Sequence, residues 1–214
     1  MANKDVIEKD RDGNVVRMQR FDAEGKLIFT HVTEWKDGRI AKKSSFDANE
    51  KMTASYDYAY DERGNNTEGS WFVFNKGELM KAEFKYDEKD RPIEVTHLGK
   101  GSIVTNKTYQ SFDEKGRIIV SEYYEAWPDC APVFTYNEYD ENGFNVKSRT
   151  EDENHNLLHY EILTPNELGK VAEYTSYDGN GKPVYTIKYY YDENGNRIKT
   201  ERYDGEGKLQ STSI

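Results

Sequence analysis

The chain has 214 residues, with 40 acidic and 30 basic side chains and a formal net charge of −10. The acidic residues are dispersed, and such a surface repels phosphate backbones and anionic lipid, so we expect no nucleic-acid or membrane-surface partner. Hydrophobic residues make up only 35% of the chain, and 17 Tyr, 9 Phe and 3 Trp supply much of that share. This composition does not favour a thick two-layer core. The single cysteine, Cys130, excludes an internal disulfide framework.

One short motif recurs from end to end: an aromatic residue, Asp, two further residues and then Gly. Its clearest copies are residues 21–25, 60–64, 112–116, 139–143, 177–181, 191–195 and 203–207. Between Asp140 and Asp204 the turn residues are 12, 14, 12, 14 and 12 positions apart, so two half-repeats make a 26-residue unit. The chain is therefore a repeat array.

The motif predicts a tight hairpin. Asp can accept local backbone N–H bonds and Gly takes positive φ without a Cβ penalty, which together favour a type I turn followed by a left-handed residue. The segments between turns are rich in Tyr, Val, Ile, Thr and Phe with period-two alternation, as in residues 183–191.

We therefore expect an all-β fold with little or no helix. About sixteen short antiparallel strands form one long up-and-down meander in a twisted or rolled sheet, and the alternative is a sandwich or closed barrel. No linker interrupts the array, so residues 1–214 are expected to form a single elongated domain. Charged residues in most strands argue against a membrane-inserted barrel, whose lipid-facing band must be apolar.

Catalytic and metal-binding patterns are scarce, and we expect a non-enzymatic protein without a cofactor or bound metal. His155 and His159 are the only closely spaced histidines, but they occupy a turn and a strand rather than one helix face. The acidic turns lack the late bidentate Glu of a calcium loop, so turn chemistry is the favoured role of their Asp and Asn residues. No apolar stretch resembles a signal peptide.

Aromatic side chains are the candidate binding residues, because Tyr and Trp present large, rigid, amphipathic surfaces. The alternative is that they close strand ends and brace the sheet. The irregular segment from Glu125 to Val133 breaks the turn pattern and is the best single candidate region. The predicted binding residues are Trp35, Trp71, Tyr123, Tyr124, Trp127, Tyr189, Tyr190 and Tyr191.

The repeated units resemble those of the YD-repeat (Rhs-type) proteins and, more loosely, the variant MORN-like β-hairpin repeats of bacteria. Residues 112–118, 139–143 and 191–198 carry the likeness. The resemblance implies a structural or recognition role at the bacterial cell exterior, and it transfers no active site. The chain is far shorter than shell-forming members of these families.

We therefore expect a structural or binding repeat module with a protein or glycan partner. The chain is surface-exposed or secreted if a leader has been removed, and otherwise cytoplasmic. Two alternatives stay open: a carbohydrate-binding protein that uses exposed Tyr and Trp rows, and an immunity or antitoxin protein that binds a basic toxin. Unpaired edge strands also predict edge-to-edge homo-oligomers.

Overall fold

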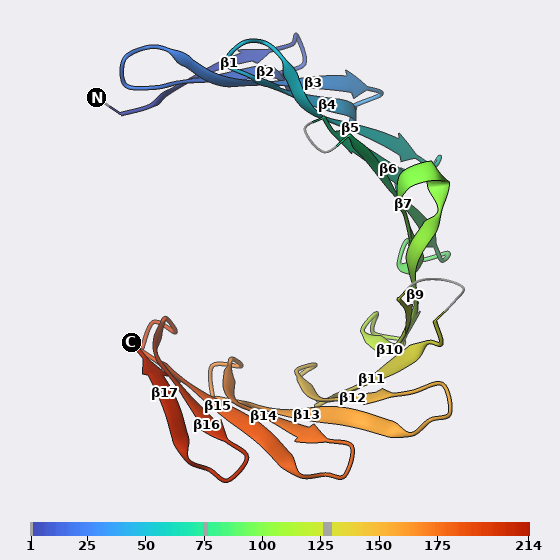
Figure 1. The fold of residues 1–214 in the computed structure, drawn as a ribbon, viewed down its shortest axis with the longest axis vertical. Coiled ribbons are helices and arrows are strands. Elements are labelled where there is room, and N and C mark those ends of the chain that lie inside the picture. The colour runs from blue at the N-terminus through green and yellow to red at the C-terminus, as the bar shows by residue number, and fades with distance from the viewer. Residues whose placement is uncertain (1, 75–76, 126–129) are drawn as a thin grey trace. The chain divides into compact units, whose positions relative to one another are not determined.

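The computed structural model describes residues 2–74, 77–125 and 130–214. These residues form 17 strands in one antiparallel sheet and a single short 3-10 turn, η1 (Lys100–Ser102). Each strand pairs with the strand next to it in the sequence, which confirms the predicted all-β meander (Figure 1). No pairing within the described residues joins β1 to β17, so neither the two-sheet sandwich nor the closed barrel is realised.

The chain divides into two compact units, Met1–Lys107 and Thr108–Ile214. Unit 1 contains eight complete strands, η1 and the first residues of β9. Its complete strands are β1 (Lys4–Lys9), β2 (Val15–Phe21), β3 (Leu27–Lys36), β4 (Arg39–Asp47), β5 (Met52–Tyr60), β6 (Asn66–Val73), β7 (Glu78–Tyr86) and β8 (Pro92–Leu98).

Unit 2 contains the remainder of β9 and eight further strands. The strand β9 spans Val104–Phe112. The eight further strands are β10 (Ile118–Tyr124), β11 (Val133–Tyr139), β12 (Asn145–Glu151), β13 (Leu157–Pro165), β14 (Val171–Asp178), β15 (Pro183–Tyr191), β16 (Arg197–Asp204) and β17 (Leu209–Ser213). Among the described residues, no helix is long and apolar enough to span a membrane.

The turns have the predicted chemistry. In the hairpin between β2 and β3, the Gly25 amide donates to the Asp22 carbonyl at 3.1 Å, and Gly25 has a φ of 84°. The Asp22 carboxylate accepts the backbone N–H groups of Glu24 and Lys26 at 3.0 and 2.9 Å. This is a type I turn closed by a left-handed residue, and Asp holds the turn through its own side chain.

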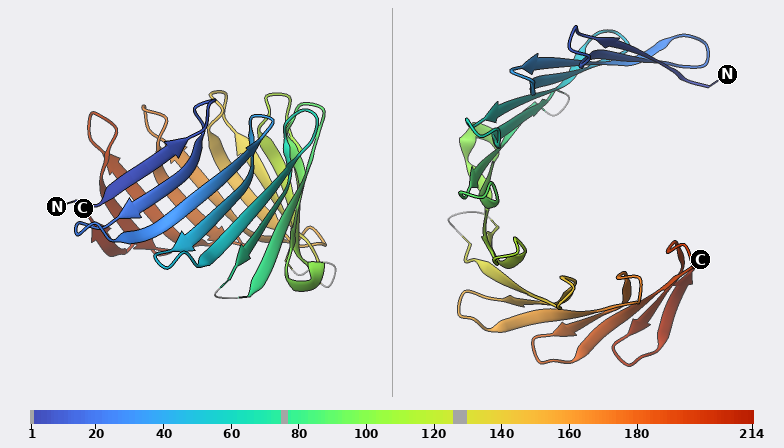
Figure 2. Two further views of the ribbon diagram at one scale, coloured as in Figure 1. Left: turned by 90° about the horizontal axis from the view of Figure 1, so that it is seen from above. Right: turned by 180° about the vertical axis from the view of Figure 1, so that it is seen from behind.

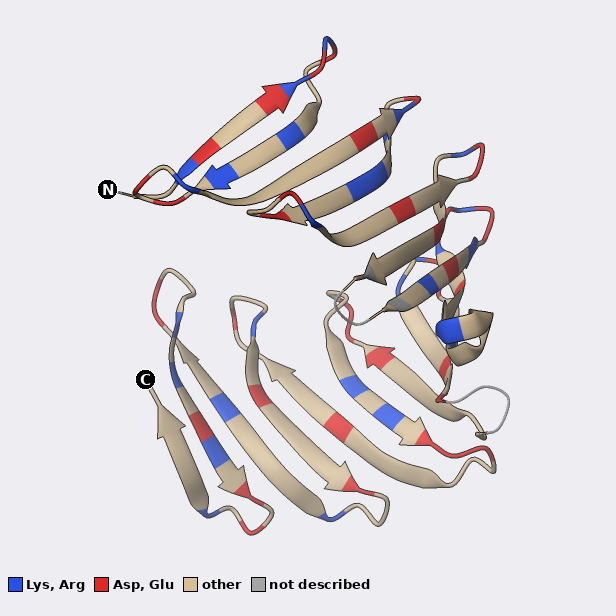
Figure 3. Cartoon of the chain, turned by 45° about the horizontal axis from the view of Figure 1, so that its top comes forward, with Lys and Arg blue, Asp and Glu red and all other residues tan. Residues whose placement is uncertain are grey.

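Within each unit, the turns form two rims (Figure 2). We call the rim made by the turns that follow odd-numbered strands the odd rim, and the opposite one the even rim. In unit 1 the odd rim includes residues 37–38 and 61–64, and the even rim includes 22–25 and 47–50. Asp and Glu are frequent in these turns (Figure 3).

Along the odd rim, neighbouring hairpins are joined by an inter-repeat staple. We use this name for a hydrogen bond from a strand-end Tyr or Trp to a backbone carbonyl 20 or 21 residues earlier. In the staple of β5, the Tyr60 hydroxyl donates to the Ile40 carbonyl at 2.9 Å, and the Arg39 guanidinium lies 5.8 Å from the Tyr60 ring centroid. The other four staples join Trp35 to Val15, Tyr86 to Asn66, Tyr139 to Ile118 and Tyr191 to Val171.

The sheet is a single layer without a conventional core. Among the described residues, Ala82 is the only apolar side chain that counts as buried, and most strand residues are half-buried. Lys side chains form ion pairs with Glu or Asp side chains on neighbouring strands. Lys81 pairs with Glu68 at 2.7 Å, and Lys188 pairs with Glu173 at 3.3 Å. Such half-exposed pairs contribute little each, so stability comes from many cross-strand contacts.

Candidate functional site

Two of the predicted binding residues act in the staples. The Trp35 Nε1–H donates to the Val15 carbonyl at 3.0 Å, and the Tyr191 hydroxyl donates to the Val171 carbonyl at 2.9 Å. Both side chains are half-buried. Their polar atoms are therefore used within the sheet, which favours the bracing role for these two residues.

The three consecutive tyrosines of β15 are divided between the two faces of the sheet, because side chains alternate along a strand. The Tyr190 hydroxyl donates to Glu201 at 2.7 Å, and Tyr203 donates to the same carboxylate at 2.7 Å. Hydrogen bonds from Tyr190, then Tyr203 and then Lys199, lower the pKa of Glu201 to about 2. Tyr189 lies on the opposite face, with the Arg197 guanidinium 5.7 Å from its ring.

Tyr123 and Tyr124 of β10 are separated in the same way. Tyr124 donates to the Glu122 carboxylate, whereas Tyr123 pairs in register with Val133 and is 37% exposed. In unit 1, Trp71 lies between Tyr56 and Met80 in the register of β5, β6 and β7. Trp127 lies outside the described residues, as does most of the irregular segment after Glu125.

One of several concave sites within the described residues lies on the odd rim of unit 1, and sequence reasoning did not single it out. We call it the rim pocket, and its volume is about 470 Å³. Its lining residues come from the end of β3, the turn that follows, β4, β5 and the turn after β5. They are Lys36, Asp37, Arg39, Ala41, Tyr58, Ala59, Tyr60, Asp61 and Glu62.

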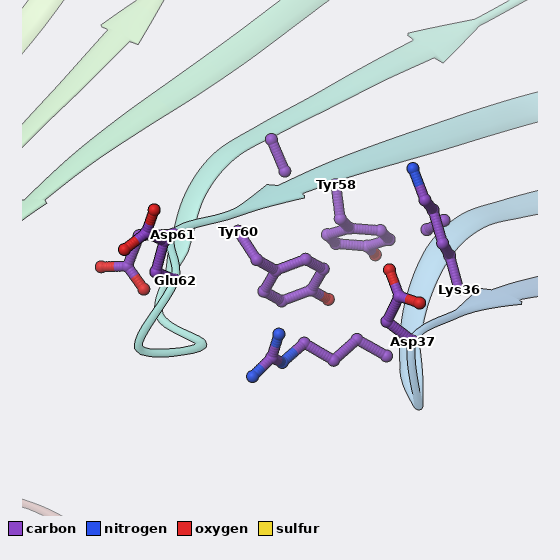
Figure 4. A pocket seen from close by; sticks show the side chains of 9 residues that line it. Lys36, Asp37, Tyr58, Tyr60, Asp61 and Glu62 are labelled. Atoms are coloured by element: carbon purple, nitrogen blue, oxygen red, sulfur yellow. The ribbon is translucent and has the colours of Figure 1, made fainter.

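The two tyrosine rings occupy the middle of the rim pocket. Figure 4 shows Lys36 and Asp37 on one side of them and Asp61 and Glu62 on the other. Tyr58 and Tyr60 lie two residues apart on one strand, so both rings project from the same face of the sheet. This arrangement puts aromatic surface between two groups of charged side chains.

Five polar side chains of the rim pocket make no hydrogen bond or ion pair within the part of the chain that the structure describes: Lys36, Asp37, Arg39, Tyr58 and Glu62. Asp61, in contrast, is held in its own turn by the Asn65 amide at 2.8 Å. Burial raises the pKa of Asp61, but the hydrogen bonds from Asn65 and Gly64 outweigh it, so the pKa is lowered overall.

Burial raises the pKa of the Tyr58 hydroxyl, and electrostatic interactions with the neighbouring Tyr60 and Tyr56 raise it further. The Tyr58 hydroxyl is therefore neutral at physiological pH, and it can both donate and accept a hydrogen bond.

Asp37 is free because its turn differs from the others. Asp37 and Gly38 both have positive φ, 51° and 74°, and Lys36 pairs directly with Arg39. This is a two-residue type I′ hairpin, in which the Asp side chain does not close the loop. The sequence carried a signal for this difference, since Asp37 is followed at once by Gly38 without the usual two-residue spacer.

The acidic turns elsewhere use their carboxylates locally. Asp192, for example, accepts the Asn196 backbone amide at 2.7 Å and the Asn196 side chain at 3.0 Å. These bonds confirm that the Asp residues serve turn chemistry. Within the described residues, no three His, Cys, Asp or Glu side chains converge as a metal site would require.

Neither protein-family models nor curated proteins gave a match to this chain. Among solved structures, similar chains include the Tc holotoxin pore of Photorhabdus luminescens, at 10% identity and a TM-score of 0.41 over 94% of this chain. This chain spans only 14% of that toxin chain. A porin-like protein from Bacteroides uniformis is similar at 11% identity and a TM-score of 0.44, over 94% of this chain and 92% of the other.

A porin-like protein from Bacteroides vulgatus is similar at 13% identity and a TM-score of 0.34, over 98% of this chain and 94% of the other. All these TM-scores lie below 0.5, so the likenesses carry no argument about what this chain does. The resemblance to YD-repeat proteins, the single-domain organisation and the edge-to-edge oligomers stay predictions. The structure itself establishes an antiparallel β-hairpin repeat fold.

Proposed function

We propose that this chain is a non-enzymatic binding module and that the rim pocket of unit 1 is its ligand site. One contrast supports the proposal. Many charged side chains on the sheet faces pair with one another, whereas the rim pocket gathers unpaired groups of both signs around two tyrosine rings. A concave site with a few convergent polar groups is the usual form of a ligand-binding site.

The proposed role agrees with the repeat architecture. A single-layer sheet presents both faces and both rims to its surroundings, and turns held by their own side chains can vary in the residues they display. The resemblance of the motifs to YD-repeat proteins supports a place at the bacterial cell surface or in the secreted fraction. In this proposal the staples and ion pairs form the scaffold, and the rim pocket carries recognition.

A binding survey tests the proposal. The purified chain is applied to a glycan array and used as bait against lysate and culture supernatant of its source, and each experiment is repeated with Tyr58→Ala. Saturable binding that Tyr58→Ala removes is the expected result, and circular dichroism confirms that the variant keeps its β-sheet. Absence of binding in both formats, or turnover of a bound glycan into product, would contradict a non-enzymatic binding role.

A further inference from the structure

We propose that the rim pocket binds an uncharged pyranose ring at the end of a glycan. This inference rests on the proposed function and names the ligand class for the same site. It uses three features of the site, namely its charge balance, its aromatic surface and the turn that leaves Asp37 free.

The first feature is the charge balance among the groups that a ligand can engage. Asp61 is committed to its turn and to Arg63 at 3.8 Å. The other charged groups of the lining are two cations, Lys36 and Arg39, and two carboxylates, Asp37 and Glu62, with no ion pair among them in the described residues. With the Asp61 carboxylate counted, the lining holds three carboxylates and two cations, so it disfavours an anionic ligand, and it offers both donors and acceptors to an uncharged one.

Sugar hydroxyls match this lining, because each hydroxyl can donate to a carboxylate and accept from an ammonium or guanidinium group. Hydrogen bonds to charged groups are stronger than those between neutral groups. An apolar ligand would use none of these polar groups, which are exposed to water, and a phosphate or sulfate group would meet the carboxylates Asp37 and Glu62. The lining thus favours a polyhydroxylated, uncharged ligand.

The second feature is the aromatic surface. The Arg39 guanidinium lies against the Tyr60 ring, whereas no ring or cation contact is made by the Tyr58 ring within the described residues. A free, half-buried tyrosine ring suits the C–H face of a pyranose, because stacking removes apolar surface of both from water. The tyrosine hydroxyl can then form a hydrogen bond with the sugar. Figure 4 shows the Tyr58 hydroxyl on the Asp37 side of the rim pocket, where both could engage one sugar.

The third feature is the shape of the Asp37 turn. Gly38, the second residue of this turn, carries no side chain, and the small Ala41 and Ala59 line the rim pocket. A volume of about 470 Å³ lies within the range of small-ligand sites and is far too small for a folded partner. We therefore assign the rim pocket to a chain-terminal sugar residue, with the remainder of the glycan directed away from the sheet.

Isothermal titration tests this assignment on the full chain. The uncharged probes are the methyl pyranosides of glucose, galactose and mannose, and glucuronic acid is the charged probe. The titrations follow the glycan array. Asp37→Asn keeps the type I′ turn, because Asn-Gly favours the same conformation, but it removes the carboxylate. Tyr58→Phe keeps the ring and removes the hydroxyl. Tyr56→Phe on the same strand and Glu24→Gln on the even rim are matched controls.

We expect at least one methyl pyranoside to bind, with Kd raised about tenfold by Asp37→Asn and several-fold by Tyr58→Phe, and changed less than about twofold by either control. Tighter binding of glucuronic acid than of the neutral pyranosides would overturn the ligand class. Pyranoside binding that neither pocket variant weakens would overturn the site. Binding of a protein but of no sugar would overturn this inference and leave the binding module standing, whereas no binding at all would defeat both.

Discussion

At the scale of single residues, the fourth position of each turn determines how much strain the repeat carries. Glycine occupies this position in most turns, but four other residues adopt positive φ in the same place: Glu50 at 61°, Asp90 at 61°, Ser102 at 60° and His155 at 62°. A non-glycine residue in this left-handed region costs about 1–2 kcal/mol. These four turns are therefore strained, and the remainder of the sheet tolerates the strain.

A reciprocal exchange tests this strain. We expect Glu50→Gly to raise the free energy of unfolding by about 0.5–1 kcal/mol, since relief of strain exceeds the added entropy of glycine in the unfolded chain. Gly25→Glu, in the adjacent even-rim turn, should lower it by a similar amount, because φ is 84° there and nothing lies within 4 Å of an added Cβ. Urea denaturation measures both, and equal stabilities of the two variants would contradict the turn assignment.

At the scale of the hairpin, three of the five staples share a pattern in which a glycine and a basic residue precede an aliphatic residue, whose carbonyl accepts the hydrogen bond from the next strand-end Tyr. In unit 2, Lys170 lies 5.5 Å from the Tyr191 ring centroid, and the Tyr191 hydroxyl bonds to the carbonyl of Val171. Arg117 and Tyr139 repeat the arrangement, with the guanidinium 4.6 Å from the ring centroid. The motif is thus a joint between consecutive hairpins as well as a turn.

Removal of one hydroxyl tests the contribution of the staple. Tyr60→Phe should lower the free energy of unfolding by about 1 kcal/mol, because the Ile40 carbonyl loses its hydrogen bond at 2.9 Å. Tyr56→Phe is the matched control, since that hydroxyl makes no hydrogen bond within the described residues. Chemical denaturation of both variants would show a clear difference between them, and equal losses would exclude a stabilising role for the staple.

The sequence predicted the turns and strands well because their causes are local. Asp and Gly determine the hairpin between β2 and β3 within five residues, so the pattern alone locates it. The rim pocket depends instead on which side chains two separate hairpins bring together and on which polar groups stay unpaired. The division of Tyr189, Tyr190 and Tyr191 between two faces follows from strand alternation, but the partners Glu201 and Arg197 depend on the pairing of β15 with β16.

At the scale of the whole molecule, the acidic turns of both units make the stability of the fold decrease at low pH. Hydrogen bonds from Arg91 lower the pKa of Asp87 to about 2, and hydrogen bonds lower the pKa of other turn aspartates in both units. A carboxylate with a lowered folded pKa stabilises the fold fully above its unfolded value near 4, and this contribution is lost as the pH falls through the folded value.

We therefore expect the thermal midpoint to fall between about pH 4 and pH 2 through these groups. Asp61→Asn combined with Asp192→Asn should reduce that fall, because Asn keeps the side-chain oxygen that accepts the backbone amides, as Asn166 already does. Glu24→Gln, on an exposed side chain, is the control. Thermal melts followed by circular dichroism from pH 7 to pH 2 measure the effect, and identical acid profiles for all the proteins would contradict it.

The 26-residue repeat also predicts which internal deletions the array tolerates. Excision of residues 140–165 joins Tyr139 directly to Asn166, and it keeps the Tyr139 and Tyr191 staples with their acceptors Ile118 and Val171. Strand alternation stays in phase, so we expect a folded, shorter sheet.

Excision of residues 141–165 leaves one extra residue in the turn and shifts the register of the joined strands, which moves every following side chain to the other face. Thermal unfolding should show a cooperative transition for the first deletion and a lower, broader one for the second. Equal behaviour of the two would show that the repeat does not depend on its period.

The single-layer sheet has a further consequence for the temperature dependence of stability. Unfolding increases the heat capacity chiefly through newly exposed apolar surface, and this chain already exposes many of its large apolar side chains, including Ile7, Leu79 and Ile198 at 55%, 53% and 51%. Its heat-capacity increment should therefore lie below the usual value of about 12–15 cal/mol/K per residue. A small heat-capacity increment reduces the curvature of the free energy of unfolding against temperature. Differential scanning calorimetry should therefore show a free energy of unfolding that varies little with temperature.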